Sequence, residues 1–84
     1  MIDIHIDLNV RTGSHGQGTF SGFLQVQGDW VPPAGVSVLA VEPESNLAAP
    51  AIVTAVNKAS TLVYMTVAWR EMKDRSLYPP ASVE

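Results

Sequence analysis

The chain has 84 residues with a net charge of −3, 15% charged side chains and no cysteine. Its length predicts one domain, the lack of cysteine excludes disulfides and thiolate chemistry, and the shortage of charge predicts a surface that protein association would cover. Five basic side chains make no stripe for phosphate groups, and no apolar run approaches the roughly 20 residues of a membrane span, so we expect a cytoplasmic protein without nucleic-acid or membrane partners.

The first ten residues alternate between apolar and polar side chains. This alternation predicts a half-buried strand over residues 2–10 whose apolar side chains point inward. The inward set comprises Ile2, Ile4, Ile6, Leu8 and Val10, and the outward set comprises Asp3, His5, Asp7 and Asn9.

Three of the outward residues, Asp3, His5 and Asp7, have the chemistry of metal ligands. Side chains two apart on a strand are about 6.5–7 Å apart at Cα, and imidazole with carboxylates suits zinc, manganese or non-haem iron. A further ligand would have to come from His15 in the loop that follows. The competing interpretation is a solvent-facing strand surface, which we favour, so no metal and no cofactor is expected. A metal-dependent activity at these residues is the second alternative function.

A glycine-rich stretch, RTGSHGQGT at residues 11–19, predicts a flexible hairpin loop. Its GSHGQG core lacks the Lys-Ser/Thr ending of a phosphate-binding loop, and a strand rather than a helix follows it. That strand, FSGFLQVQ at residues 20–27, is expected to bury Phe20, Leu24 and Val26, with a bend at Gly22.

The rest of the chain predicts three more strands, at residues 36–41, 51–57 and 61–69. They are separated by a proline-containing turn at 28–35, a loop at 42–50 and a short turn at 58–60. The last strand places Val63, Met65, Val67 and Trp69 on one apolar face. Five strands with short turns predict an all-β fold, a small five-stranded barrel with a long N-terminal hairpin. We expect one domain over residues 1–72 and a polar, proline-containing C-terminal tail over 73–84.

The segment 35–72 resembles short, largely uncharacterised bacterial and phage proteins with an SH3-like barrel. The resemblance lies in a V-x-V strand, an A-x-V strand and an LVY-x-x-V-x-W strand, carried by Val36, Val38, Ala51, Val53, Leu62, Val63, Tyr64, Val67 and Trp69. It implies an SH3-like fold and brings no activity with it. Those proteins often have an acidic residue before the tryptophan, where this chain has Ala68.

Four side chains are candidates for a protein interface. Phe23, Leu62 and Tyr64 are out of phase with the apolar faces of their strands, which predicts an outward apolar patch. Trp30 precedes two prolines in a turn, where it would contact a partner or close the barrel as a lid.

The absence of a nucleophile motif and the filled interior of a small barrel favour a function without catalysis. We therefore expect a protein-interaction module that binds itself as a homo-oligomer or docks on a protein partner. The first alternative is a structural component of a larger assembly such as a phage particle, in which case the protein would act in the host cytoplasm.

Overall fold

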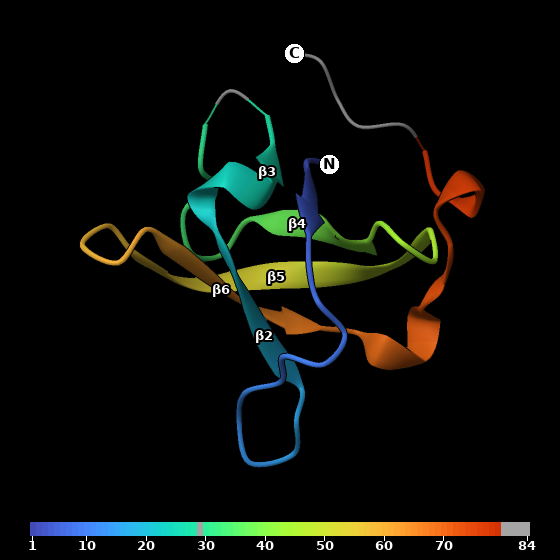
Figure 1. The fold of residues 1–84 in the computed structure, drawn as a ribbon, viewed down its shortest axis with the longest axis horizontal. Helices are drawn as coiled ribbons and strands as arrows, with labels where there is room; N and C mark the ends of the chain where they lie inside the picture. Colours follow the sequence, from blue (N-terminus) through green and yellow to red (C-terminus); the bar gives the residue numbers. More distant parts are fainter. Residues whose placement is uncertain (29, 80–84) are drawn as a thin grey trace.

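The computed structural model describes residues 1–28 and 30–79, which form a single curled β-sheet with short 3-10 turns (Figure 1). The strands are β1 (Asp3–His5), β2 (Gly18–Gly22), β3 (Val26–Gln27), β4 (Ser37–Glu42), β5 (Leu47–Asn57), β6 (Leu62–Val67) and β7 (Lys73–Asp74). The 3-10 turns are η1 (Phe23–Gln25), η2 (Trp69–Glu71) and η3 (Arg75–Leu77). Within these described ranges, no helix has the length and apolarity needed to cross a membrane.

The strands lie in the order β2-β6-β5-β4-β1-β3, and β7 pairs with β5 beside this path. All pairs are antiparallel except β1 and β4, which are parallel. The outermost strands of the path, β2 and β3, are separated in sequence only by η1, so the sheet curls back toward itself. The predicted all-β class is confirmed. The sheet has seven strands rather than five because η1 splits the strand expected at 20–27 and because β7 was not expected.

The predicted inward phase is confirmed for the four aliphatic side chains from Ile2 to Leu8. Ile4 and Ile6 are 0% and 5% exposed, and Ile2 and Leu8 pack against the same cluster. At Asp3 and His5 the opposite face is not the solvent-facing surface that we favoured, because the Asp3 side chain is 17% exposed and pairs with Arg75, and His5 is half-buried. The regular strand is shorter than predicted, because β1 ends at His5 and the chain turns soon after it. The inward side chains belong to the larger hydrophobic cluster of the sheet, which we call the main core. Its buried members are Ile4, Ile6, Val38, Ala40, Ala49, Ala51, Val53, Val63, Met65 and Val67.

The almost continuous apolar run of β4 has a simple explanation, because both of its faces are covered. One face joins the main core, while Leu39 and Val41 on the opposite face form a second buried cluster with Ala48. We call these three residues the outer cluster. Tyr78 packs against them.

The expected loop at 42–50 is wrong in its second half, because β5 already begins at Leu47. Pro50 lies inside this strand, opposite Leu39 of β4. The N–H of Leu39 donates to the carbonyl of Ile2, just before β1, on the other side of β4. Leu39 and Pro50 therefore form a pair without hydrogen bonds between them, and the missing N–H of proline costs no bond to β4. The Pro50 carbonyl accepts from the N–H of Ala68 at 2.9 Å.

The predicted phase of β2 is wrong. Thr19 and Ser21 are the buried side chains, at 0% and 8% exposure, whereas Phe20 points outward and Leu24 is 94% exposed. The hydroxyl of Thr19 donates to the carbonyl of Val10 and that of Ser21 to the carbonyl of His5, both at 2.6 Å.

Ser21 joins β2 to the last residue of β1 and Thr19 joins it to the segment that follows, and no strand ladder connects β1 with β2. Polar side chains are therefore favoured on this inner face. Among the described residues, every buried polar side-chain atom has a hydrogen-bond partner.

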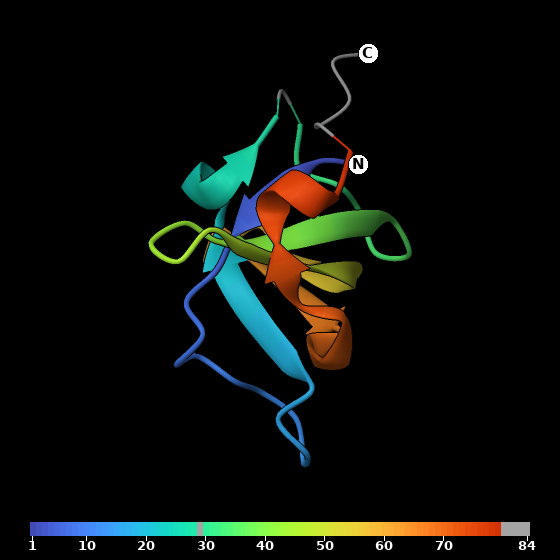
Figure 2. The same ribbon diagram turned by 90° about the vertical axis from the view of Figure 1, so that its right-hand side faces the viewer.

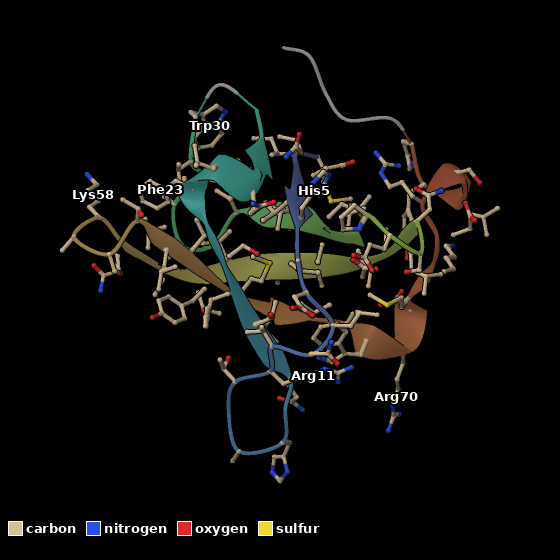
Figure 3. The ribbon with its side chains drawn as sticks, viewed as in Figure 1. His5, Arg11, Phe23, Trp30, Lys58 and Arg70 are labelled. Atoms are coloured by element: carbon tan, nitrogen blue, oxygen red, sulfur yellow. The ribbon has the colours of Figure 1, made fainter. Side chains whose placement is uncertain are left out.

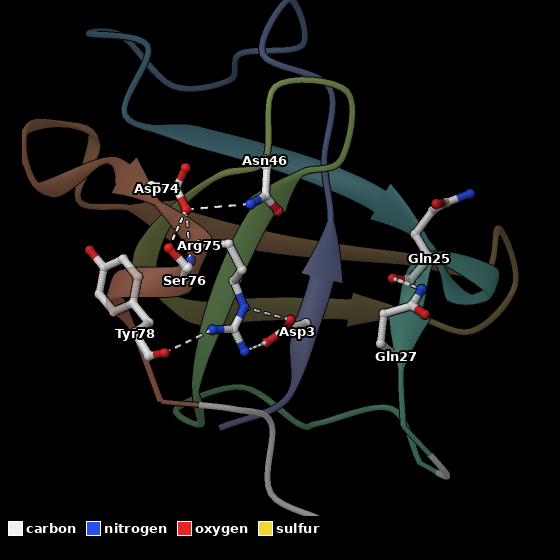
Figure 4. A network of polar contacts seen from close by, with 8 residues as sticks. All are labelled: Asp3, Gln25, Gln27, Asn46, Asp74, Arg75, Ser76 and Tyr78. Carbon is white, nitrogen blue, oxygen red and sulfur yellow. Dashed lines mark hydrogen bonds and ion pairs between the residues drawn. The ribbon is translucent and has the colours of Figure 1, made fainter.

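Residues 73–79, which we call the C-terminal strap, fold back over the outer cluster (Figure 2). Lys73 and Asp74 pair with the start of β5, and Tyr78 supplies the apolar cover. Arg75 ties the strap to β1 through Asp3, with its Nε 2.8 Å from one carboxylate oxygen and its Nη2 3.0 Å from the other (Figure 4). This part of the predicted tail is thus packed on the sheet, and residues 80–84 lie outside the described residues.

Candidate functional site

The outer face of the sheet continues beyond the strap as an open groove of about 850 Å³. Pro50 and Ile52 of β5 line it, together with Trp69 of η2 and the N-terminal Met1. Ile52 is 51% exposed and Met1 is 50% exposed. Because residues 48, 50 and 52 share one face of β5, the groove extends the apolar surface that the strap covers at Ala48.

Trp69 is held in place from two directions. Its indole Nε1 donates to the carbonyls of Gly16 (3.0 Å) and Gln17 (3.1 Å). Both lie in residues 12–18, a turn closed by an isolated bridge that we call the first hairpin; the long N-terminal hairpin that was predicted is wrong, because β1 and β2 do not pair with each other. The guanidinium of Arg11 lies 3.9 Å from the ring centroid, a cation–π contact (Figure 3 shows Arg11 between the hairpin and η2). The side chain is therefore fixed at the groove before any partner arrives.

The end of β6 determines where Trp69 lies. β6 ends at Val67, and the chain then turns into η2, whose Glu71 N–H donates to the carbonyl of Ala68. Trp69 was expected to continue the buried face of β6. It instead packs partly against the main core and partly lines the groove.

The first hairpin has an ordered base. Thr12 and Gly18 exchange two backbone hydrogen bonds of 2.8 and 3.0 Å, and a Cβ on Gly18 would meet the Thr12 hydroxyl at 2.4 Å. Gly13 and Gly16 have φ of +87° and +65°, conformations that favour glycine. The glycines expected to give a flexible loop therefore serve a defined turn that brings Gly16 to Trp69.

The charged side chains that line the groove are Arg70 and Glu71, and the imidazole of His15 lies beside them. Arg70 is exposed and extends from η2 away from the sheet (Figure 3). The backbone carbonyl of Glu71 accepts from the Tyr78 hydroxyl at 2.6 Å. Burial, followed by the negative charge of Glu71, raises the pKa of Tyr78. Glu71 thus lies between the strap and the groove, and its carboxylate is a negative charge in both.

The candidate metal ligands are engaged in other contacts. Both carboxylate oxygens of Asp3 accept from Arg75, and Asp7 accepts from the N–H of Asn9 at 2.9 Å. His5 is half-buried. In residues 1–28 and 30–79 no three histidine, cysteine, aspartate or glutamate side chains gather as a metal site would require.

The four candidate interface residues do not form one surface. Leu62 and Tyr64 lie on the outward face of β6, where the Tyr64 ring packs on Phe20 with centroids 5.6 Å apart. Phe23, expected beside them, lies in η1 and packs against the main core. Trp30 is 52% exposed in the turn after β3.

Sequence reasoning missed the groove, although part of its signal is present. Ile52 alternates with the core residues Ala51 and Val53, so its position already predicts an exposed aliphatic side chain. Arg70 lines the groove only because the chain turns at η2. The sequence did not predict this turn, because the apolar pattern of β6 continues to Trp69.

Comparisons with protein-family models, with curated proteins and with solved structures found no match to this chain. The function is therefore argued from the geometry of the groove and of the outward face of β6.

Proposed function

We propose that this chain is a non-catalytic protein-interaction module and that the groove is its binding site. One observation carries the proposal: a tryptophan fixed by two hydrogen bonds and a cation–π contact lies in the same groove as a half-exposed isoleucine. Rigid aromatic side chains beside apolar surface dominate the energetics of protein interfaces, because they lose little conformational entropy on binding.

We further propose that the curled sheet is an SH3-like barrel. The continuous path from β2 through η1 to β3 supports it, because these elements connect the two ends of the strand order. In a barrel of this size side chains fill the interior, which leaves the outer face for binding.

Selection of short random peptides on the immobilised protein tests the proposed function. We expect enriched peptides to bind wild-type protein, and Ile52→Asp to weaken them about tenfold or more, because it places a charge in the apolar groove. Thr54→Asp is the matched control, since it adds the same charge at an exposed position of the same strand. Peptides that bind Ile52→Asp as well as wild type would place the site elsewhere, and circular dichroism verifies that both variants fold.

Self-association is the second candidate, favoured by the outward pairing of Tyr64 with Phe20 beside Leu62. If this face joins copies of the chain, as in a homo-oligomer or a larger particle, light scattering will give a multiple of the chain mass. Tyr64→Lys should then produce a folded monomer, whereas Thr54→Lys should leave the mass unchanged. A mass unaffected by Tyr64→Lys would exclude this face as the contact.

A further inference from the structure

The basic side chains of this acidic chain are unevenly distributed. Only five lysines and arginines are present among 84 residues. Arg75 is paired with Asp3 in the strap, and Lys73 lies over the ring of Tyr78 at 4.7 Å. The remaining three are Lys58 in the turn between β5 and β6, Arg11 above Trp69, and Arg70 in the groove.

The groove therefore combines an apolar floor with cationic groups. Arg70 lines it, and Arg11 lies against the face of Trp69. Glu71 is the acidic side chain among the described lining residues, and it follows Arg70 directly in η2. A chain with a net charge of −3 thus places two arginines, Arg70 in the lining and Arg11 on the ring of Trp69, beside one lining carboxylate, Glu71.

From this complementarity we propose that the groove binds an extended acidic segment of a partner protein, an inference that rests on the proposed function. An apolar side chain of the segment seats against Ile52 and Trp69. A neighbouring carboxylate pairs with the guanidinium of Arg70, which binds carboxylates in a two-pronged, charge-assisted geometry.

A protein segment fits these groups better than a nucleic acid. Nucleic-acid binding depends on neutralising many phosphates, and the groove offers two arginines on a chain whose overall charge repels a polyanion. A short acidic segment needs only one or two such pairs, with the apolar contact supplying the rest of the affinity.

The test uses the composition of the selected peptides and one pair of charge-reversal variants. We expect the enriched peptides to contain aspartate or glutamate next to a large apolar residue. Arg70→Glu should weaken the best peptide about tenfold or more, as loss of a charged hydrogen bond predicts. Lys58→Glu makes the same change in net charge at the turn far from η2 (Figure 3) and should leave the affinity within about twofold.

A second arm changes the peptide instead of the protein. Replacing its acidic residues with asparagine and glutamine should weaken binding about as much as Arg70→Glu does, and Arg70→Glu should weaken the binding of this neutral peptide no further. If the enriched peptides are neutral or basic and their binding is still weakened by Ile52→Asp, this inference is overturned and the proposed function stands. If no peptide is enriched, both fail. Binding of a labelled single-stranded oligothymidine that Arg70→Glu abolishes would likewise overturn it, in favour of a nucleic acid.

Discussion

Replacing Trp69 with alanine should lower the free energy of unfolding by about 3 kcal/mol, toward the low end for such truncations because the ring is only partly buried. The change removes packing against the main core, the two hydrogen bonds to the first hairpin and the contact with Arg11. Trp69→Phe keeps an aromatic ring and loses the N–H donor, so it should cost about 1 kcal/mol.

Urea denaturation followed by circular dichroism measures both losses. Trp30→Ala is the matched control, since it truncates the other tryptophan at a site that is 52% exposed. Amide hydrogen exchange at Gly16 should become faster in both Trp69 variants, because the hairpin loses its attachment. If Trp69→Ala costs no more than Trp30→Ala, the tryptophan does not anchor the groove.

The second large effect is expected where the hydroxyls of Thr19 and Ser21 join β2 to the end of β1 and to the segment after it. Thr19→Val keeps the shape of the side chain but leaves the carbonyl of Val10 without its donor, and Ser21→Ala does the same to the carbonyl of His5. Each substitution should cost about 1–3 kcal/mol, because a partly buried acceptor loses its partner. The double variant should lose close to the sum, a large part of the roughly 5–10 kcal/mol expected for a domain of this size.

Thr54→Val provides the reference for this pair, because the same substitution at an exposed position of β5 should change stability by no more than about 0.5 kcal/mol. Thermal and urea unfolding of the four variants and wild type measure the differences. Equal stability of Thr19→Val and Thr54→Val would mean that the two hydroxyls do not hold the curled sheet together.

Sequence periodicity predicted those parts of the fold in which one face of a strand is buried by the main core. Ile4 and Ile6 at the N-terminus, and Val63 and Met65 of β6, point inward as their alternation indicates. In these segments hydrophobic burial alone determines which side chains face the core.

The same reasoning failed where another interaction determines the phase. In β2 the need to satisfy the carbonyls of His5 and Val10 turns Thr19 and Ser21 inward, against their polarity. The strap is polar and contains proline, and its position depends on pairing with Leu47 and on the ion pair of Arg75 with Asp3, separated by 72 residues. Such long-range partners leave no local pattern.

The candidate site was predictable only in part. Leu62 and Tyr64 face outward on β6, as their phase indicates, but Phe23 turns toward the core because η1 interrupts its strand. The groove combines residues from the N-terminus, the first hairpin, β4, β5 and residues 66–71. The turn that directs Trp69 into it could not be predicted, because the apolar pattern of β6 continues through residue 69.

The central claim, that the groove is the binding site, is tested most directly by an NMR titration of the labelled protein with the most enriched peptide. We predict shift changes at the amides of Gln17, Ile52 and Arg70 and at the indole N–H of Trp69. Changes confined to Phe20 and Tyr64, with the groove resonances unmoved, would contradict it.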